Sequence, residues 1–303
     1  LLHSLEGKDK EKNASFEKEM QALCMEWAEF SGEPFDMLVA KDGAILFHGA
    51  FGENLRGKFT LEEPTEIASI TKLYTGLLFA QFVDQGLIGI DDPVGKYLPD
   101  FPSTGEKAIT LRQCFTHTSG YNGHGSFGGV QNPWLDNSLA LWLPYLEPGK
   151  RHYYNGMGYN LAGKVMEIVS GKSVFHLMHE YLFAPLQLQH TQLDIDLAYG
   201  IRSTAFDMAV VGQMLLNQGG YGDLRFFSEE TYEALLPVDL ENYFPNIKDR
   251  KWGIGITPMN RYLKDEGSGE KRNILSDHVI GHGSATSSIL NVDLENKIVI
   301  CQS

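Results

Sequence analysis

Residues 35–52, FDMLVAKDGAILFHGAFG, contain two runs of aliphatic, aromatic and β-branched residues separated by Asp42 and Gly43. Asp-Gly is among the dipeptides that most favour the tight turn of a β-hairpin, because both turn positions must tolerate a positive φ. Runs of this length bounded by turn residues are typical of strands. The stretch therefore predicts an antiparallel pair of strands, and the rest of the sheet has to be sought on either side of it.

A helical pattern precedes this hairpin. Residues 13–33, NASFEKEMQALCMEWAEFSGE, begin with polar residues, among which Ser15 is a suitable helix cap. Apolar side chains then recur every three or four residues, at Phe16, Met20, Leu23, Cys24, Trp27 and Phe30. Because this spacing places them on one face of a helix, we expect an amphipathic helix that lies against the sheet.

The C-terminal part of the chain returns to the texture of strands. Residues 251–258 (KWGIGITP), 278–292 (HVIGHGSATSSILNV) and 297–303 (KIVICQS) are rich in β-branched and aliphatic residues. They are separated by turn-forming stretches, of which KDEGSGEKRN has the composition of a solvated loop. We therefore predict that residues 1–62 and 245–303 together build one discontinuous sheet domain.

Helical patterns dominate the chain between these two parts. The candidate helices, each punctuated by Gly, Pro or Asn, are residues 69–86, 160–172, 173–186 and 204–220. We assign residues 63–244 to a mostly helical inserted domain. The predicted fold class is α/β of the α+β type, an antiparallel sheet flanked by helices, and the cleft between the two domains is the natural place for a site.

Composition and charge exclude several classes of function. The 303 residues carry a formal net charge of −14 and the pI is about 5.1, whereas nucleic acids and anionic membranes are bound by basic surfaces. No run reaches the ~18 apolar residues of a membrane span, and the opening residues lack the layout of a signal peptide. Cys24, Cys114 and Cys301 have apolar neighbours, so we expect buried free thiols.

Residues 66–76, EIASITKLYTG, place a serine and a lysine three positions apart in an apolar, helix-prone setting. Residues with this spacing share one face of a helix, so Lys72 would lie beside Ser69. A serine hydroxyl becomes a strong nucleophile when a base accepts its proton, and a lysine can do so when burial destabilises its ammonium form. The pair predicts acyl transfer, with Ser69 as nucleophile and Lys72 as proton acceptor.

The spacing alone is a weak signal, because Ser followed at the third position by Lys also occurs at Ser15 and at Ser268. Neither of those two pairs has an apolar setting. The simplest alternative for Ser69 and Lys72 is a helix start with a lysine whose stem covers apolar surface while its amine reaches water.

Over nearly its whole length, the chain resembles the serine β-lactamases of class C and the related DD-peptidases and esterases that share the penicillin-binding fold. The Ser-x-x-Lys motif at Ser69 is one of their marks. FTHTSG at 115–120 and LIGIDDPVGKYLPDF at 87–101 are the most distinctive further matches. Other matching segments, in family order, are residues 35–52, 148–163, 184–193, 203–220 and 252–256. The resemblance implies a β-lactamase/transpeptidase-like fold.

By resemblance, the second motif of the site is Tyr-x-Asn, in which the phenol works with the lysine as general base and then as acid for the leaving group. The spacing to both flanking family segments leads to Tyr154. This frame puts Gly156 where the family has asparagine. The alternative frame, Tyr153 with Asn155 as a substrate-binding residue, keeps the asparagine and breaks both spacings.

The third family motif is Lys or His, then Thr or Gly, then Gly, on a strand at the edge of the site. It reads here as His282, Gly283 and Ser284. By resemblance, these residues bind substrate, and the backbone amides of Ala285 and Ser69 form the oxyanion hole. A neutral histidine in place of lysine attracts a substrate carboxylate less strongly, and Ser284 replaces a glycine that lets substrate approach the strand.

Other kinds of site lack the residues that they need. No Gly-x-Ser-x-Gly elbow of a lipase-type hydrolase occurs in the chain. His176 and His179 share a helix face without a third ligand nearby, so we predict no metal. The tetrapeptide GHGS recurs at residues 123–126, where it lacks strand texture and is interpreted as part of a loop lining the cleft.

These observations predict a serine acyl hydrolase that works through an acyl-enzyme on an amide or ester bond. The substrate would be a β-lactam, a D-Ala-D-Ala-type peptide or a small ester, and the route needs no cofactor. The resemblance implies a periplasmic or extracellular location, and we expect a monomer. The alternative is a catalytically impaired module that binds penicillin or peptidoglycan peptides or acts as a sensor, because the second and third motifs are altered.

Overall fold

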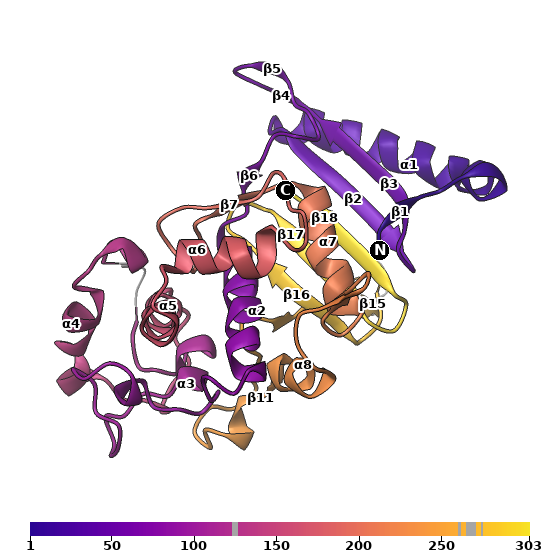
Figure 1. The fold of residues 1–303 in the computed structure, drawn as a ribbon. Coiled ribbons are helices and arrows are strands. Elements are labelled where there is room, and N and C mark those ends of the chain that lie inside the picture. Colours follow the sequence, from indigo (N-terminus) through magenta and orange to yellow (C-terminus); the bar gives the residue numbers. More distant parts are fainter. Residues whose placement is uncertain (123–126, 260–261, 265–270, 274) are drawn as a thin grey trace.

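The computed structural model describes residues 1–122, 127–259, 262–264, 271–273 and 275–303. Seven strands in these ranges form the central sheet: β1 (His3–Ser4), β2 (Phe35–Lys41), β3 (Ala44–Phe51), β13 (Thr257–Pro258), β16 (Val279–Gly283), β17 (Ile289–Asp293) and β18 (Ile298–Gln302). Their order is β1-β3-β2-β18-β17-β16-β13 (Figure 1), antiparallel apart from the pairing of β1 with β3. Both ends of the chain therefore build the sheet, which confirms the predicted fold class.

The hairpin of residues 35–52 forms as its sequence predicts. β2 and β3 pair from Phe35 with Phe51 to Lys41 with Ala44. The turn residues Asp42 and Gly43 have φ values of 50° and 84°. A two-residue turn with both φ values positive matches the right-handed twist of the strands, so the Asp-Gly dipeptide sets the start of the sheet.

Helix α1 (Gly7–Ser31) covers one face of the sheet and packs on β3 (Figure 1). Its buried Cys24 joins a small core cluster with aromatic side chains of β2 and β3. The helix begins earlier than expected, so Ser15 is not its cap and instead donates to Glu19. Leu23, Trp27 and Phe30 are exposed, because the sheet contacts only the narrower stripe through Met20, Cys24 and Ala28.

Helix α7 (Ala205–Leu216) covers the opposite face of the sheet and contacts β2, β17 and β18. Thr204 caps the helix by accepting a hydrogen bond from the amide of Asp207. The main core includes the space between α7 and the sheet, where Leu38, Leu290 and Val299 are fully buried, and continues among the other helices. This helix belongs to the segment 63–244 that the sequence assigns to the inserted part, yet it packs on the sheet.

The other helices gather beside the sheet and around α2 (Figure 1). α2 contacts α5, α6 and α8, and nearly all of its side chains are buried. Residues 173–186, predicted as one helix, form α6 and then a π-helical turn at His179–Phe183. The bounds are α2 (Thr71–Asp84), α3 (Leu111–Phe115), α4 (Leu135–Ala140), α5 (Met157–Ser170), α6 (Val174–Met178) and α8 (Glu229–Leu235).

Short strands pair outside the central sheet. β6 (Thr65–Glu66), β7 (Gln192–Leu193) and β8 (Ile201–Ser203) form a three-stranded sheet just before α2. The two-stranded pairs comprise β4 (Glu53–Asn54), β5 (Gly57–Lys58), β9 (Gly220–Tyr221), β10 (Leu224–Arg225), β11 (Val238–Asp239), β12 (Lys251–Trp252), β14 (Tyr262–Lys264) and β15 (Lys271–Asn273). The GHGS copy at 123–126 and most of the predicted loop at 264–273 lie outside the described residues.

Two expectations about the chain as a whole can be compared with the structure. All three cysteines are buried free thiols, which confirms the prediction that they form no disulfide. Within the described ranges, no helix is long and apolar enough to cross a membrane.

Candidate active site

Ser69 lies where the sheet meets the helices. It belongs to η1 (Ala68–Ile70), the 3-10 turn between β6 and α2, and β16 packs beside this turn. Ala68 has a φ of 42°, a left-handed conformation that costs free energy for a residue with a Cβ. The backbone is held there because Ile67 donates to the carbonyl of Ile201 on β8 at 3.1 Å. The sequence thus places Ser69 in a fixed turn immediately before a buried helix.

Lys72 is in the first turn of α2 and is only 3% exposed. Its Nζ lies 3.3 Å from Ser69 Oγ and donates to the carbonyl of Ala198 at 2.9 Å. Burial lowers the pKa of the amine from 10.5 to about 7, although Asp196 acts in the opposite direction. A neutral amine is therefore well populated near neutral pH, and its lone pair can accept a proton from Ser69.

Two neighbouring tyrosines were candidates for the second base, and the structure brings Tyr154 to the pair. Lys72 Nζ lies 4.6 Å from the centroid of the Tyr154 ring, and the phenol lies near enough to Ser69 for that side chain to act on its pKa. Burial raises the pKa of this phenol. Tyr153 instead accepts a hydrogen bond from Arg151 at 3.2 Å. Of the two tyrosines, Tyr154 is therefore the one that lies at the Ser69–Lys72 pair.

Asn155 does not face the cleft, contrary to the substrate-binding role considered for it. It is 1% exposed. Its side chain donates to the carbonyls of Tyr121 and Tyr153 and accepts from the amide of Gly158. These bonds engage both N–H groups and the oxygen of the carboxamide, so Asn155 shapes the turn that carries Tyr154.

Aromatic rings and imidazoles enclose the Lys72 amine. The His117 ring lies 4.4 Å from the Tyr154 ring and 4.9 Å from the Trp252 ring. Trp252 in turn lies 6.4 Å from His282. Burial and the nearby Lys72 hold the pKa of His117 well below its ordinary value and lower that of His282 to about 4. These imidazoles are neutral at physiological pH, so they add no positive charge beside the lysine.

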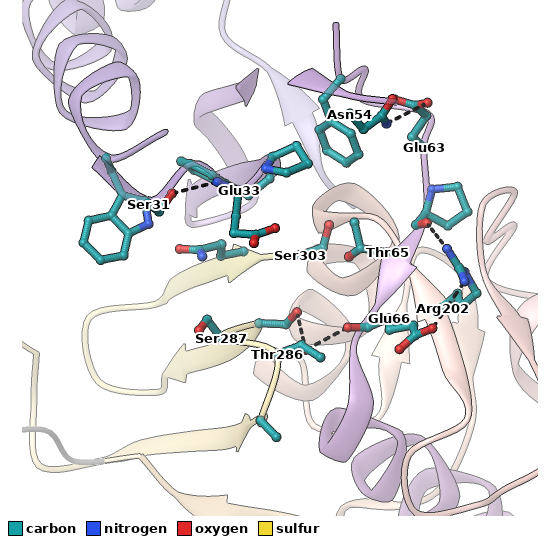
Figure 2. Close-up of a pocket in the computed structure, with 18 of the residues that line it drawn as sticks. Ser31, Glu33, Asn54, Glu63, Thr65, Glu66, Arg202, Thr286, Ser287 and Ser303 are labelled. Atoms are coloured by element: carbon teal, nitrogen blue, oxygen red, sulfur yellow. Dashed lines mark hydrogen bonds and ion pairs between the residues drawn. The ribbon is translucent and has the colours of Figure 1, made fainter. Parts of the chain in front are cut away.

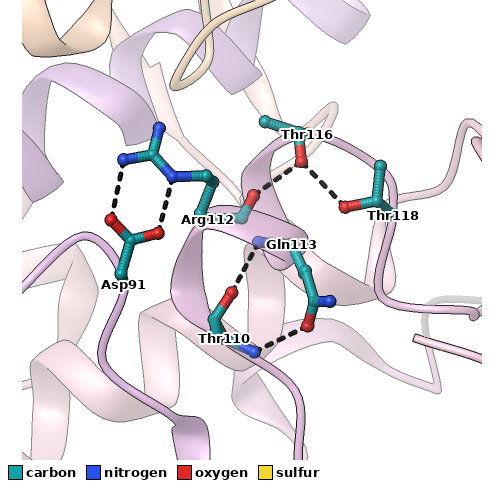
Figure 3. A network of polar contacts seen from close by, with 6 residues as sticks. All are labelled: Asp91, Thr110, Arg112, Gln113, Thr116 and Thr118. Atoms are coloured by element: carbon teal, nitrogen blue, oxygen red, sulfur yellow. Dashed lines mark hydrogen bonds and ion pairs between the residues drawn. The ribbon is translucent and has the colours of Figure 1, made fainter. Parts of the chain in front are cut away.

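The segment FTHTSG holds His117 in this enclosure. It follows α3, which Thr110 caps and which Arg112 ties to Asp91 through two hydrogen bonds of 2.6 and 2.9 Å (Figure 3). Thr116 Oγ1 donates back to the carbonyl of Arg112 at 2.8 Å. His117 itself has a φ of 58°, so this network stabilises a turn that the residue would not adopt alone.

The third motif lies at the end of β16, which stops at Gly283. The sequence places the motif and Ala285 on one strand, whereas Ser284 and Ala285 follow in a turn. His282 is only 4% exposed, and its Nδ1 lies 2.6 Å from the carbonyl of Gly283. The ring therefore lies inside the wall of the site, and the expectation that His282 steers substrate stays a prediction.

The turn after β16 is fastened to the chain that leads into Ser69. Thr286 Oγ1 donates to the carbonyl of Glu66 at 2.8 Å, and Glu66 faces Arg202 (Figure 2). Ala285 is exposed beside this bond and lines one end of a groove of about 920 Å³. The fastening holds the exposed turn with Ala285 next to the chain entering η1, as an oxyanion hole made by their amides requires.

Sequence reasoning missed three residues that the structure places at Lys72, namely Ala198, Asp196 and His117. Ala198 is 126 positions from Lys72, and no local spacing relates the two residues. FTHTSG was recognised as a distinctive segment, but its contact with Tyr154 could not be inferred from the sequence. In the part of the chain that the structure describes, no group of three potential metal ligands is found.

Comparisons with known proteins agree with the architecture. The Beta-lactamase family model matches residues 36–301. The teichoic acid D-alanine hydrolase of Staphylococcus aureus is 38% identical over 128 residues, which cover 41% of this chain and 31% of that protein.

Solved structures show the same fold. EstCE1, described as a hydrolase with promiscuous acyltransferase activity, superposes with a TM-score of 0.72 at 16% identity, over 98% of this chain and 94% of its own. A D-stereospecific amidohydrolase from Streptomyces has a TM-score of 0.63 at 22% identity, over 89% and 88%. The match of the family model over most of the chain decides the assignment: the protein is a serine hydrolase that belongs to the Beta-lactamase family.

Proposed function

We propose that the protein cleaves an ester or amide bond through an acyl-enzyme on Ser69. Ser69 Oγ attacks the carbonyl carbon while Lys72 Nζ accepts the hydroxyl proton, and the amides of Ser69 and Ala285 hold the oxyanion. The leaving group departs with a proton, and water then hydrolyses the ester on Ser69. The observation that carries this proposal is a buried amine with a pKa of about 7, 3.3 Å from the serine oxygen.

Tyr154 is proposed to pass the proton on to the leaving group. Because burial raises the pKa of its phenol, the hydroxyl is protonated at neutral pH and is a poor base by itself. Its position beside Ser69 and Lys72 would allow it to give its proton to the leaving group and to recover one from the lysine. Lys72 is then the base, and Tyr154 is the relay and acid.

We infer further that the preferred substrate has no carboxylate beside the bond that is cleaved. The ring in the third motif is buried, and its pKa of about 4 makes it neutral at physiological pH. A neutral imidazole cannot pair with a substrate carboxylate as an ammonium group does. A simple ester or uncharged amide fits this wall better than a β-lactam or a D-alanyl peptide, both of which carry a carboxylate near the scissile bond.

The test compares three substrates on the protein and on Ser69→Ala. An uncharged chromogenic ester, a chromogenic cephalosporin and a D-Ala-D-Ala peptide are assayed for hydrolysis, and intact mass is recorded after incubation with a labelled penicillin. We expect rapid ester hydrolysis that Ser69→Ala abolishes, together with little cephalosporin or peptide turnover. Unchanged ester hydrolysis in Ser69→Ala would refute the proposed nucleophile, and preferred cephalosporin turnover would refute the inferred substrate class.

The impaired binding module predicts a different outcome of the same experiment. A penicillin adduct on Ser69 that persists for hours, with no turnover of any of the three substrates, would favour it. A periplasmic or extracellular location and a monomeric state are parts of the proposal that cell fractionation and size-exclusion chromatography with light scattering can check.

A further inference from the structure

We propose that Asp196 positions Lys72 for proton transfer by holding the carbonyl of Ala198 against the lysine amine. This inference rests on the proposed function, in which Lys72 is the base that activates Ser69. Asp196 would be a positioning residue, since none of its described contacts is with Ser69 itself.

The carboxylate of Asp196 is fully buried and bonded from two sides. Oδ1 accepts from the amide of Ala198 at 2.7 Å, and Oδ2 accepts from Asn160 Nδ2 of α5 at 2.8 Å. The backbone of Tyr199 also donates to it. An acidic side chain that is out of water and bonded to its own loop fixes the path of that loop.

The loop around Ala198 is clamped between α5 and the first two turns of α2. Leu197 donates its amide to Asn160 Oδ1 at 3.0 Å, and its carbonyl accepts from Thr75 Oγ1 at 2.7 Å. The amide of Ile201 donates to Thr71 Oγ1 at 2.9 Å. Since Thr71 and Thr75 flank Lys72 on the same helix, the loop and the lysine are held in one frame.

Gly156 allows this loop to come close. A Cβ added at Gly156 would lie 2.9 Å from the Cβ of Ala198 and 3.9 Å from Asp196 Oδ1. The residue two positions after Tyr154 therefore leaves room for the loop that carries the lysine's partner. Gly156, which departs from the family pattern, is thus the residue that makes room for Ala198 at Lys72.

The bond to Ala198 decides where the lone pair of Lys72 points. A lysine side chain has several rotatable bonds, and its amine can turn freely unless a partner holds it. With one N–H directed to the Ala198 carbonyl at 2.9 Å, the amine stays within 3.3 Å of Ser69 Oγ. Loss of this partner would let the amine turn away, and misplacement of a catalytic group by about 1 Å can cost about 10²-fold in rate.

The other titratable groups around Lys72 do not substitute for Asp196. Tyr154 and Tyr159 present ring faces to the amine, and His117 and His282 are neutral imidazoles whose pKa values are lowered in part by Lys72 itself. Asp196 is the acidic group whose charge raises the pKa of Lys72. Its removal is therefore expected to lower that pKa, whether through lost charge or through a displaced carbonyl.

The experiment measures how fast a fluorophosphonate ester phosphonylates Ser69 between pH 5 and 9, followed by intact mass. In this reaction the Ser69 oxygen bonds to phosphorus, fluoride leaves, and Lys72 takes the hydroxyl proton. For Asp196→Asn we expect the plateau rate to fall by roughly tenfold or more, but by less than the 10²–10⁴ that a general base contributes in total. Below the plateau, the rate falls as Lys72 becomes protonated, and we call this part of the pH profile the acidic limb. It should move to lower pH by roughly one unit, as when an opposite charge is lost.

Two further variants separate positioning from general damage to the fold. Asp207→Asn makes the same change at another buried aspartate, which accepts from His190 and Thr191 and does not act on Lys72. We expect it to leave the limb in place. Thr75→Val removes a clamp on the loop but keeps the charge of Asp196, and we expect a lower plateau with a smaller shift of the limb.

The outcomes distinguish this inference from the function on which it rests. Equal labelling of the protein and of Ser69→Ala would mean that the proposed nucleophile is wrong. Labelling that depends on Ser69, together with an unmoved limb in Asp196→Asn, would overturn the role of Asp196 alone, even if the plateau fell, because a purely structural defect lowers the amplitude without moving the limb. Thermal unfolding of each variant checks that it is folded.

Discussion

At the scale of single residues, Lys72 carries a conflict between stability and function. Its side chain is 3% exposed, although lysine is among the residues least often buried. Burial lowers the pKa from 10.5 to about 7, so the folded protein bears the cost of an ammonium group that is disfavoured in its interior. The same burial makes the amine a base near neutral pH.

Replacing Lys72 by methionine should therefore stabilise the fold while abolishing acylation of Ser69. The sign follows from linkage: a group whose folded-state pKa is lowered opposes folding fully below about pH 7, and this cost fades as pH rises toward 10.5. We expect a gain on the order of 2 kcal/mol at pH 6, smaller than the shift alone implies because Ala198 loses its donor. Urea unfolding at pH 6 and pH 9 measures it, and a gain that does not shrink at pH 9 would contradict the explanation.

The pH dependence of turnover should report the same amine. For an uncharged ester, kcat/KM is expected to rise with pH and to level off above about pH 7, because the protonated amine cannot accept the proton of Ser69. Burial lowers the pKa of His282 to about 4, so this ring should not contribute to the limb. Initial rates between pH 5 and 9 provide the test, and a rate that still rises steeply at pH 9 would show that the lysine is hydrated.

The two adjacent tyrosines form a matched pair of variants. Both are a little more than a third exposed, yet Tyr154 lies beside Ser69 and the Lys72 amine, whereas the hydroxyl of Tyr153 accepts from Arg151. Tyr154→Phe should lower kcat/KM by roughly 10²-fold, the lower end of acid–base catalysis, and Tyr153→Phe should leave it nearly unchanged. The reverse order of effects would restore the alternative frame of the motif.

At the scale of elements, the position of α2 depends on one glycine. A Cβ added at Gly76 would lie 2.2 Å from the carbonyl oxygen of Ile254 and 2.9 Å from its carbon. These are backbone atoms, so the helix that carries Lys72 would have to move.

Gly76→Ala is thus expected to destabilise the protein by about 2 kcal/mol and to lower kcat, although alanine is the better helix former by about 1 kcal/mol. Urea unfolding and ester hydrolysis are the measurements. A variant at least as stable as the parent protein, with full activity, would mean that α2 tolerates the added methyl group without moving.

Elements with a local signal could be predicted from the sequence, whereas contacts between distant elements could not. The hairpin follows from Asp42 and Gly43, and α2, α5 and α7 follow from apolar, helix-prone segments punctuated by Gly, Pro or Asn. The sequence predicts too wide a buried face for α1. Apolar residues spread over a wider part of the helix surface than the stripe that contacts the sheet. Ser69 and Lys72 were found by spacing, but Ala198 comes from a loop more than a hundred residues away.

At the scale of the whole molecule, Asp36 joins parts of the chain that are far apart in sequence. Its carboxylate accepts from the amide of Ala205 at the start of α7 and from the hydroxyl of Ser303. Burial raises its pKa from 3.8 to about 6. The folded protein therefore binds this proton more tightly than the unfolded chain does.

Asp36→Asn should consequently gain relative stability as pH rises. An acid with a raised folded-state pKa opposes folding fully above about pH 6, and this opposition fades as pH falls toward 3.8. We compare the free energy of unfolding of the variant with that of the parent at each pH. The variant should gain on the order of 2 kcal/mol over the parent between pH 4 and pH 7. Equal differences at the two pH values would place the group in water.

The position of β18 has a consequence for biosynthesis. This strand pairs with β2 on one side and with β17 on the other, so residues near 300 sit beside residues near 40 in the middle of the sheet. While the ribosome is still making the intervening segments, the β2–β3 hairpin has an unpaired edge that is open to association with other nascent chains. We expect refolding to be slow for this reason, since pairing across so long a stretch of chain must precede closure of the sheet.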